Sequence, residues 1–250
     1  MHDIRYDAVH DEIFVANPFA QAILTFRGDA NGEEPPIRII QGPHTDLQTP
    51  DVLEIDPVHN EVFVPDTGSI RVFRRDAQGD TAPLRTLRTD AGSLGGGTVV
   101  DPIHNILVNA GSISVAGKRQ AALLIFNRTD SGDAKPRAII SGPKTGLTGT
   151  SMRLRQIYPE GGWIVVTAYT PGAEMLEPEN AFVGIWSIND SGDVPPRWRI
   201  NGASARPTNV LERPLGVALN PKYKEVIVSD MGNNAVLTYS LPEMFEAQQK

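Results

Sequence analysis

Six polar side chains, scattered along the sequence, have the types that bind ligands or support hydrolysis. They are the imidazole of His2, the amide of Asn17, the carboxylates of Asp51, Asp66 and Asp230, and the guanidinium of Arg153. A carboxylate can ligate a divalent cation or act as a general base, and an arginine can stabilise an oxyanion. Asp51, Asp66 and Arg153 are therefore catalytic candidates, Asp51 is the candidate metal ligand, and all six are candidate ligand-binding residues.

Two recurring phrases define the elements that must position these side chains. The first runs from an aromatic residue to Gly six residues later, then an acid, then Pro four residues after the Gly; its copies begin at Phe26, Phe73, Phe126 and Trp186. The second is Asp-x-x-His-x-Glu and its variants; its copies begin at Asp7, Asp56, Asp101 and Asn220, with a degenerate copy at Tyr158. A repeat of this kind cannot bury its apolar face alone, so the units must pack on one another.

Short apolar runs around both phrases predict strands. Runs such as Ile13–Val15 and Val62–Val64 are bounded by Gly, Asp, Asn and Pro, which is the signature of strands. Units of four short strands, recurring every 45 to 62 residues, predict an all-β protein, a β-propeller of four-stranded antiparallel blades. We expect a single domain over residues 1–250, with blades at residues 2–42, 50–90, 97–142, 152–201 and 214–241.

The fifth repeat lacks the first phrase and has no visible outer strand after Tyr239. Met1 stands six residues before Asp7, which leaves no room upstream for that strand. Two explanations stay open: the sequence begins inside the fold, or the last blade has three strands. The ring is accordingly five-bladed or a relative of six-bladed rings. We expect residues 244–250 to cap the exposed edge, and an unpaired edge also favours an edge-strand dimer.

Regular recurrence argues against chemistry within the phrases themselves. His10, His59 and His104 occupy one repeat position, and equivalent positions on different blades lie much farther apart than the roughly 2.0–2.1 Å of a metal–imidazole bond allows. We expect these imidazoles to hydrogen-bond the turn. The Gly-acid segments have some likeness to calcium loops, but their presence in four repeats favours hairpin turns in which Gly supplies a positive φ.

The six candidate residues, by contrast, break the repeat. His2, Asp51 and Arg153 stand five residues before the second phrase, and Asn17, Asp66 and Asp230 end the second strands. In a propeller, the starts of the inner strands surround one mouth of the central channel, where polar groups can converge. The sequence predicts a ligand site at this rim. The alternative is that these residues only solvate the channel and cap loops.

Composition excludes several classes of partner. The net charge is −7 and no Lys/Arg-rich run occurs, so we expect neither nucleic acid nor an anionic membrane as a partner. No apolar stretch approaches the ~18 residues of a membrane span, and the chain has no Cys. We expect a soluble protein whose compartment stays open; a secreted or periplasmic protein with an upstream signal is one alternative.

The segment Asp56-Pro-Val-His-Asn-Glu-Val-Phe-Val, with Pro214-Leu-Gly-Val-Ala-Leu-Asn-Pro, resembles the six-bladed propeller superfamily of NHL-repeat and gluconolactonase-like proteins. The resemblance spans nearly the whole chain and is nearest to uncharacterised bacterial propellers. For the gluconolactonase-like group it implies a divalent metal, Ca or Mg, held at the channel mouth by Glu, Asn and Asp. The corresponding positions here hold His2, Asp51, Gly96, Arg153 and Leu215, of which Asp51 alone has that chemistry.

Two functions from different classes follow. The first is a binding or scaffold protein with a small molecule or a protein bound at the channel rim, because no complete catalytic motif accompanies the blade phrases. The alternative is a metal-dependent lactonase or esterase-like hydrolase at the channel mouth. There Asp51 or Asp66 would ligate the metal or act as base, and Arg153 would stabilise the oxyanion.

Overall fold

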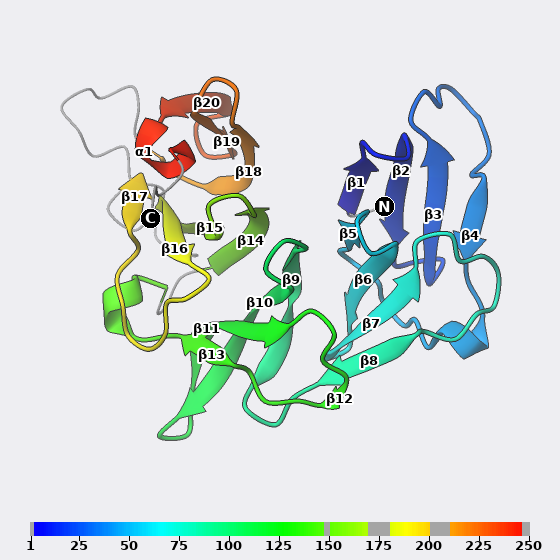
Figure 1. Ribbon diagram of the computed structural model, residues 1–250, viewed down its shortest axis with the longest axis horizontal. Helices are drawn as coiled ribbons and strands as arrows, with labels where there is room; N and C mark the ends of the chain where they lie inside the picture. Colours follow the sequence, from blue (N-terminus) through cyan, green and yellow to red (C-terminus); the bar gives the residue numbers. More distant parts are fainter. Residues whose placement is uncertain (1–2, 148–150, 170–180, 201–210, 247–250) are drawn as a thin grey trace.

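The computed structural model describes residues 3–147, 151–169, 181–200 and 211–246. These residues form five small antiparallel sheets that are the blades of a β-propeller (Figure 1). The predicted all-β propeller is therefore confirmed, and so is the absence of an outer strand from the last blade in the described part of the chain. Among the same residues, no helix is long and apolar enough to cross a membrane.

Strands follow one another from the central channel outward in every blade. Blade 1 contains β1 (Asp3–Asp7), β2 (Glu12–Asn17), β3 (Ala22–Arg27) and β4 (Arg38–Ile40). Blade 2 contains β5 (Glu54–Asp56), β6 (Glu61–Asp66), β7 (Ser69–Arg74) and β8 (Arg85–Arg88). Blade 3 contains β9 (Ser93–Asp101), β10 (Ile106–Val115), β11 (Lys118–Asn127) and β13 (Ala138–Ile140). Blade 4 contains β14 (Ser151–Tyr158), β15 (Trp163–Tyr169), β16 (Phe182–Ser187) and β17 (Trp198–Ile200). Blade 5 contains β18 (Pro214–Asn220), β19 (Glu225–Asp230) and β20 (Ala235–Ser240).

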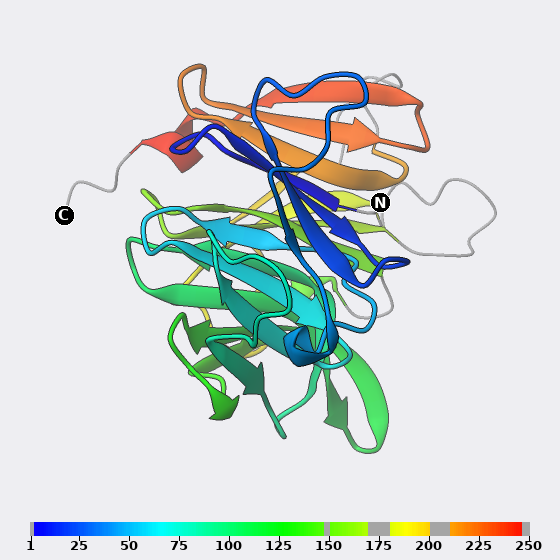
Figure 2. The ribbon, with the colours of Figure 1, turned by 90° about the vertical axis from the view of Figure 1, so that its right-hand side faces the viewer.

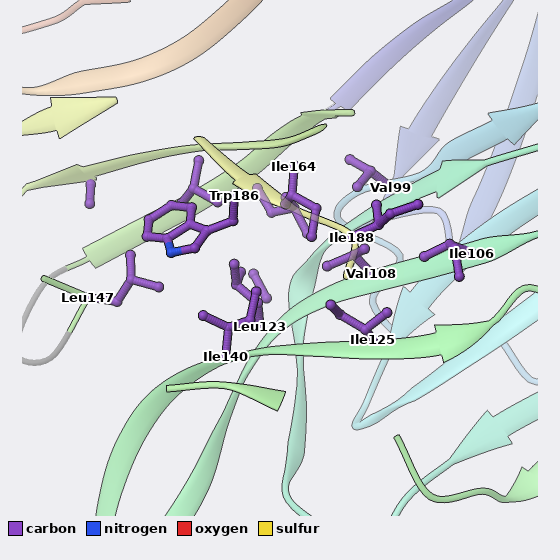
Figure 3. Close-up of a cluster of buried hydrophobic side chains, with 14 of the residues drawn as sticks. Val99, Ile106, Val108, Leu123, Ile125, Ile140, Leu147, Ile164, Trp186 and Ile188 are labelled. Atoms are coloured by element: carbon purple, nitrogen blue, oxygen red, sulfur yellow. The ribbon is translucent and has the colours of Figure 1, made fainter. Parts of the chain in front are cut away.

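The core lies between blades rather than within them. Side chains alternate between the two faces of a strand, so each central strand contributes to two interfaces. Figure 3 shows the interface of blades 3 and 4, where Leu123 and Ile140 meet Ile164 and Trp186, all of them buried. Similar apolar clusters join blade 1 to blade 2, blade 2 to blade 3, and blade 4 to blade 5.

The C-terminal segment packs at the last of these interfaces. The short helix α1 (Pro242–Phe245) buries Met244 completely, and the Met244 carbonyl accepts a hydrogen bond of 3.0 Å from the indole of Trp163 in blade 4. The sequence predicts that residues 244–250 cap the exposed edge of the last blade. The described part of this segment, residues 244–246, instead covers the seam between blades 4 and 5. Residues 247–250 lie outside the described part.

The second phrase forms a hydrogen-bonded turn, as predicted. In three blades the carboxylate of the leading Asp is at most 2% exposed and contacts the histidine Nδ1 three residues on. The pairs are Asp7–His10 at 2.8 Å, Asp56–His59 at 2.7 Å and Asp101–His104 at 2.7 Å. These histidines therefore stabilise the turn between the first and second strands.

In two of these turns, an arginine from the following blade contacts the acidic side chains. Arg128, two residues after the aromatic of blade 3, donates to Glu61 in blade 2 and lies 3.5 Å from Asp56. Arg75 makes the corresponding contacts from blade 2 to Glu12 and Asp7. Desolvation alone would raise the pKa of Glu61, but hydrogen bonds and charges from Arg85 and Arg128 outweigh it and hold that pKa below its ordinary value.

The first phrase joins neighbouring blades through the backbone. Its Gly has a φ between +62° and +79° in all four copies, which confirms the predicted turn. In blade 2 the amide of Gly79 donates to the Ile39 carbonyl at 2.6 Å, and the Gly79 carbonyl accepts from Gln41 at 3.1 Å. Gly192 repeats both bonds with Ile139 and Ser141, while β12 (Gly132–Asp133) pairs in parallel with β8. The hairpins of blades 2, 3 and 4 thus extend the sheet of the preceding blade.

Removing the Arg128 guanidinium should destabilise the ring. We expect Arg128→Ala to lower the free energy of unfolding by about 3 kcal/mol, because it leaves Glu61 and Asp56 buried with one cation fewer. Arg128→Lys should recover part of this loss. The matched control is Arg74→Ala, which removes an exposed pair with Asp76 and should change stability by less than about 1 kcal/mol. Urea denaturation followed by tryptophan fluorescence measures both; equal losses would contradict the role given to Arg128.

Candidate functional site

A small pocket opens at the rim of the channel between blades 2 and 3. Its volume is about 160 Å³, and its lining comes from the crossover before β5, the β6–β7 hairpin and the start of β9. The lining residues are Thr49, Asp51, Pro65, Asp66, Thr67, Gly68, Ser69, Leu94 and Gly95. Small-molecule sites commonly measure ~300–1,000 Å³, so this pocket suits one polar side chain or a chain terminus.

Asp66 forms the floor of this pocket and organises the loop beside it. Its side chain is fully buried, and the carboxylate accepts hydrogen bonds from the amides of Gln48 and Thr49 at 2.5 and 3.0 Å. The hydroxyl of Thr49 adds a third bond at 3.3 Å. Asp66 therefore holds the crossover from blade 1 against the end of blade 2, and its lone pairs are largely used by this loop.

Arg71 supplies the positive charge that compensates these carboxylates. Its guanidinium is buried, lies 3.8 Å from Asp66, and donates to the Asp66 carbonyl at 2.8 Å and to the Ser69 hydroxyl at 3.0 Å. It also pairs with Asp46 at 2.7 Å. Because Arg71 is fully engaged below the pocket, the exposed Asp51 is the charged group that a ligand entering from solvent meets at the rim.

The structure brings Asp51 and Asp66 together but places the other candidates in other blades. Asp230 is 2% exposed and accepts from four backbone amides, those of Glu212, Arg213, Gly232 and Asn233. Asn17 accepts from Ala20 at 3.2 Å, and Arg153 lies exposed on β14. Asn17 and Asp230 thus make the loop-capping contacts of the alternative interpretation. His2 lies outside the described residues.

The channel wall next to this pocket carries a second charged group. Arg5 on β1 reaches across to Glu54 on β5 at 3.4 Å and lies 3.8 Å from Asp3, whose carboxylate accepts from the Leu53 amide at 3.2 Å. Burial raises the pKa of Glu54 to about 7, although the positive charge of Arg5 opposes this shift. Glu54 is therefore poised to exchange a proton near neutral pH.

Within the described parts of the chain, no group of three or more His, Asp or Glu side chains has an arrangement that could hold a metal ion. The carboxylates of Asp51 and Asp66 share one small pocket, but Asp66 is tied to the loop. A divalent metal at Asp51 stays a prediction, as does hydrolysis with Arg153.

Sequence reasoning missed most of the pocket lining. Thr49 and Gly95 belong to segments that match neither phrase, and Ser69 and Arg71 lie on a strand where alternation alone gives no sign of a site. One signal was present: Arg71 puts a charge on a central strand, where an unpaired charge could not be buried. Such a residue needs carboxylate partners, and one of the two that Arg71 has, Asp66, lines the pocket.

Comparison with solved structures supports the fold. A protein from Lactobacillus plantarum aligns with a TM-score of 0.64 at 15% identity, covering 96% of this chain and 66% of that one. Sqt1 from Chaetomium thermophilum, solved bound to the N-terminus of a ribosomal protein, aligns with a TM-score of 0.57 at 10% identity, covering 96% of this chain and 58% of that one. The chain thus spans just under two thirds of the first structure and less of the second.

At such identities the likeness concerns the propeller fold alone. No protein family matches the chain by its sequence profile, and no curated protein matches it in sequence.

Titration of Glu54 should make stability depend on pH. A carboxyl whose pKa is about 7 when folded, against 4.5 when unfolded, binds more protons in the folded state. Its contribution to the free energy of unfolding is therefore complete below pH ~4.5 and is lost as the pH rises through about 7, by about 3 kcal/mol. We expect Glu54→Gln to remove this part of the dependence of the free energy of unfolding on pH.

Urea denaturation at pH values between 4.5 and 8 measures the effect as a difference between the two proteins. Glu33→Gln, at an exposed position, is the control and should leave the slope unchanged. If wild type and Glu54→Gln lose stability in parallel over this range, Glu54 does not titrate there.

Proposed function

We propose that this protein is a binding propeller that holds a cationic group of a protein partner in the rim pocket between blades 2 and 3. The observation that carries the proposal is the exposed carboxylate of Asp51, set beside the buried Asp66 in a pocket that fits one side chain. A lysine, an arginine or a free N-terminal amine has the matching size and charge.

The charge of the whole chain supports the same class of partner. A net charge of −7 favours the approach of basic segments and disfavours acidic ones. The hydroxyls of Thr49 and Ser69 add hydrogen-bonding groups to the pocket lining. The fold neighbour Sqt1 bound to the N-terminus of a ribosomal protein is an instance of a propeller that holds a chain terminus.

Removing the Asp51 charge should weaken this binding. Suitable probes are fluorescein-labelled octapeptides that carry one Lys, one Arg or a free N-terminal amine, titrated by fluorescence anisotropy in low salt. We expect Asp51→Asn to raise the dissociation constant by about tenfold, which corresponds to about 1.4 kcal/mol. The control is Asp29→Asn, a carboxylate that is 72% exposed far from the pocket lining and should have no effect.

The salt dependence gives a second measure of the same contact. An ion pair at the rim is screened, so the affinity of the wild type should fall with added NaCl more steeply than that of Asp51→Asn. A wild type that binds none of the peptides, or a control as weak as Asp51→Asn, would contradict the proposed site.

The hydrolase alternative predicts a different response to metals. If the protein is a binding propeller, about 5 mM Ca²⁺, Mg²⁺ or Zn²⁺ should leave the melting temperature within about 1 °C, because only a ligand of the folded state raises it. A clear rise that disappears in Asp51→Ala, accompanied by esterase turnover of p-nitrophenyl acetate, would instead establish metal-assisted hydrolysis.

A further inference from the structure

Among the described residues, one face of blade 1 has no neighbouring blade. Ile4 and Tyr6 on β1 are 57% and 59% exposed, and Ile37 and Ile39 near the outer strand are 42% and 37% exposed. Figure 2, viewed from the side of blade 1, shows its strands in front of the other blades. An apolar sheet face of this extent indicates an interaction surface.

The residues of this face match those that bury the corresponding face of blade 2. There Val62, Val64 and Phe73 are at most 1% exposed and pack on Phe14 and Ile23 of blade 1. Counting from the second phrase, Ile13 and Val15 of blade 1 correspond to Val62 and Val64. Phe26 pairs with Ile13 as Phe73 pairs with Val62, so it corresponds to Phe73. These three residues of blade 1 line a depression of about 220 Å³ with Ile4 and Gly32. The face therefore has the composition of a blade-to-blade interface.

The hairpin of blade 1 also lacks the partner that its counterparts have. Gly79 and Gly192 each exchange two backbone hydrogen bonds with the outer strand of the preceding blade, and Asp80 accepts from the amide of His44 at 2.6 Å. In blade 1, Gly32 has the same positive φ of 62° and Glu33 stands at the position of Asp80. Within the described residues, neither Gly32 nor Glu33 makes a hydrogen bond.

The opposite end of the ring shows a complementary open face. On blade 5, Val236 is 70% exposed, and Glu225 stands at the position where Glu12 and Glu61 receive an arginine from the next blade. Among the described residues, Glu225 has one hydrogen bond, from Asn220 at 3.2 Å. Figure 1 shows blades 1 and 5 standing apart at the two ends of the arc.

We propose that the open face of blade 1 binds a sixth blade of the same ring, a four-stranded sheet built on this chain's own repeat. Its outer strand would pair in parallel with the Gly32 hairpin, and its Gly-Pro turn would offer amides to Glu33. Its apolar face, equivalent to Phe14 and Ile23, would cover Ile13 and Phe26. Continuity with the four existing interfaces selects this occupant, because an isolated peptide strand would satisfy Gly32 but leave the apolar face exposed.

A second copy of this chain fits the surface less well. Two blade 1 faces placed together would bring two unpaired hairpins against each other without an outer strand for either. Blade 5 of another copy offers three strands, so it also lacks the outer strand that Gly32 requires. A second copy is therefore the competing outcome that the experiment must detect.

The first experiment follows amide hydrogen exchange of the 250-residue chain by NMR. We expect the Gly32 amide to exchange at least tenfold faster than those of Gly79 and Gly192, equally at 20 µM and 500 µM. Slow exchange at both concentrations would overturn the proposal, because the hairpin would then already have a partner. Slow exchange at the higher concentration alone would replace the sixth blade with a second copy.

The second experiment supplies the blade. A second copy of residues 3–51 is fused directly ahead of Asp3, since Asp3 and Val52 are equivalent positions of the repeat. We expect the fused protein to stay monomeric by light scattering, to slow exchange of the original Gly32 amide at least tenfold, and to bind several-fold less of an apolar dye. The control is the same fusion with Phe14→Asp in the added copy only.

The control should leave Gly32 exchange fast while the original five blades stay folded. A well-folded fusion in which Gly32 exchanges as fast as in the unfused chain would overturn the proposal. So would equal protection in the fusion and its control. If the fusion does not fold, exchange of the Gly32 amide in the unfused chain still tests the proposal. It shows whether the hairpin is open, already has a partner within the chain, or pairs with a second copy.

Discussion

The backbone hydrogen bonds between one blade's hairpin and the preceding blade's outer strand are the constraint on which the ring depends. A blade has an exposed outer edge, and an unpaired edge is both costly and prone to aggregation. Gly79, Gly132 and Gly192 resolve this for blades 1 to 3 by adding a short parallel segment to that edge. The same contact fixes the angle between blades, so the apolar faces meet in register. The positive φ of the Gly is what turns its amide toward the neighbour.

Buried charge is the second consequence of this packing. The Asp-His turns bring carboxylates with almost no exposure to the seams between blades, where a lone charge would be strongly destabilising. Arg75 and Arg128 come from the neighbouring blade and not from the turn itself, so Asp7 and Asp56 gain these guanidinium groups only when the blades assemble. Glu12 and Glu61 also pair with Arg38 and Arg85 of their own blades, and the neighbouring arginine adds a second cation to each. An assembled pair of blades is therefore more favourable than either blade alone by an electrostatic as well as an apolar contribution. In blade 4, Ile188 stands at the arginine position and packs near His104 instead.

Local patterns were enough to predict the strands, the turns and the three-stranded last blade. The apolar run Val62–Val64, for example, lies within β6 (Glu61–Asp66), because alternation and turn residues act over a few positions. The contacts between blades were beyond this reasoning: His44 meets Asp80 and Arg128 meets Glu61, 36 and 67 residues away in sequence. The phrase Gly-acid-x-x-Pro was interpreted as a hairpin alone, whereas the structure adds its bond to the preceding blade. Of the candidate site, Asp51 and Asp66 do share a pocket, since both flank the first two strands of one blade.

The two carboxylates of the rim pocket differ in how strongly the fold determines them. Asp66 holds the crossover loop through three hydrogen bonds and lies against Arg71, so its replacement would disturb the path from blade 1 to blade 2. Asp51 is exposed and stands where the repeat places a different residue in each blade, so the ring does not dictate its identity. If Asp51 binds a partner as proposed, partner choice can change at Asp51 and its equivalents while the hydrogen bonds that build the ring stay the same. A repeat that leaves one rim position undetermined in every blade allows the residues of the channel mouth to vary without altering the fold that carries them.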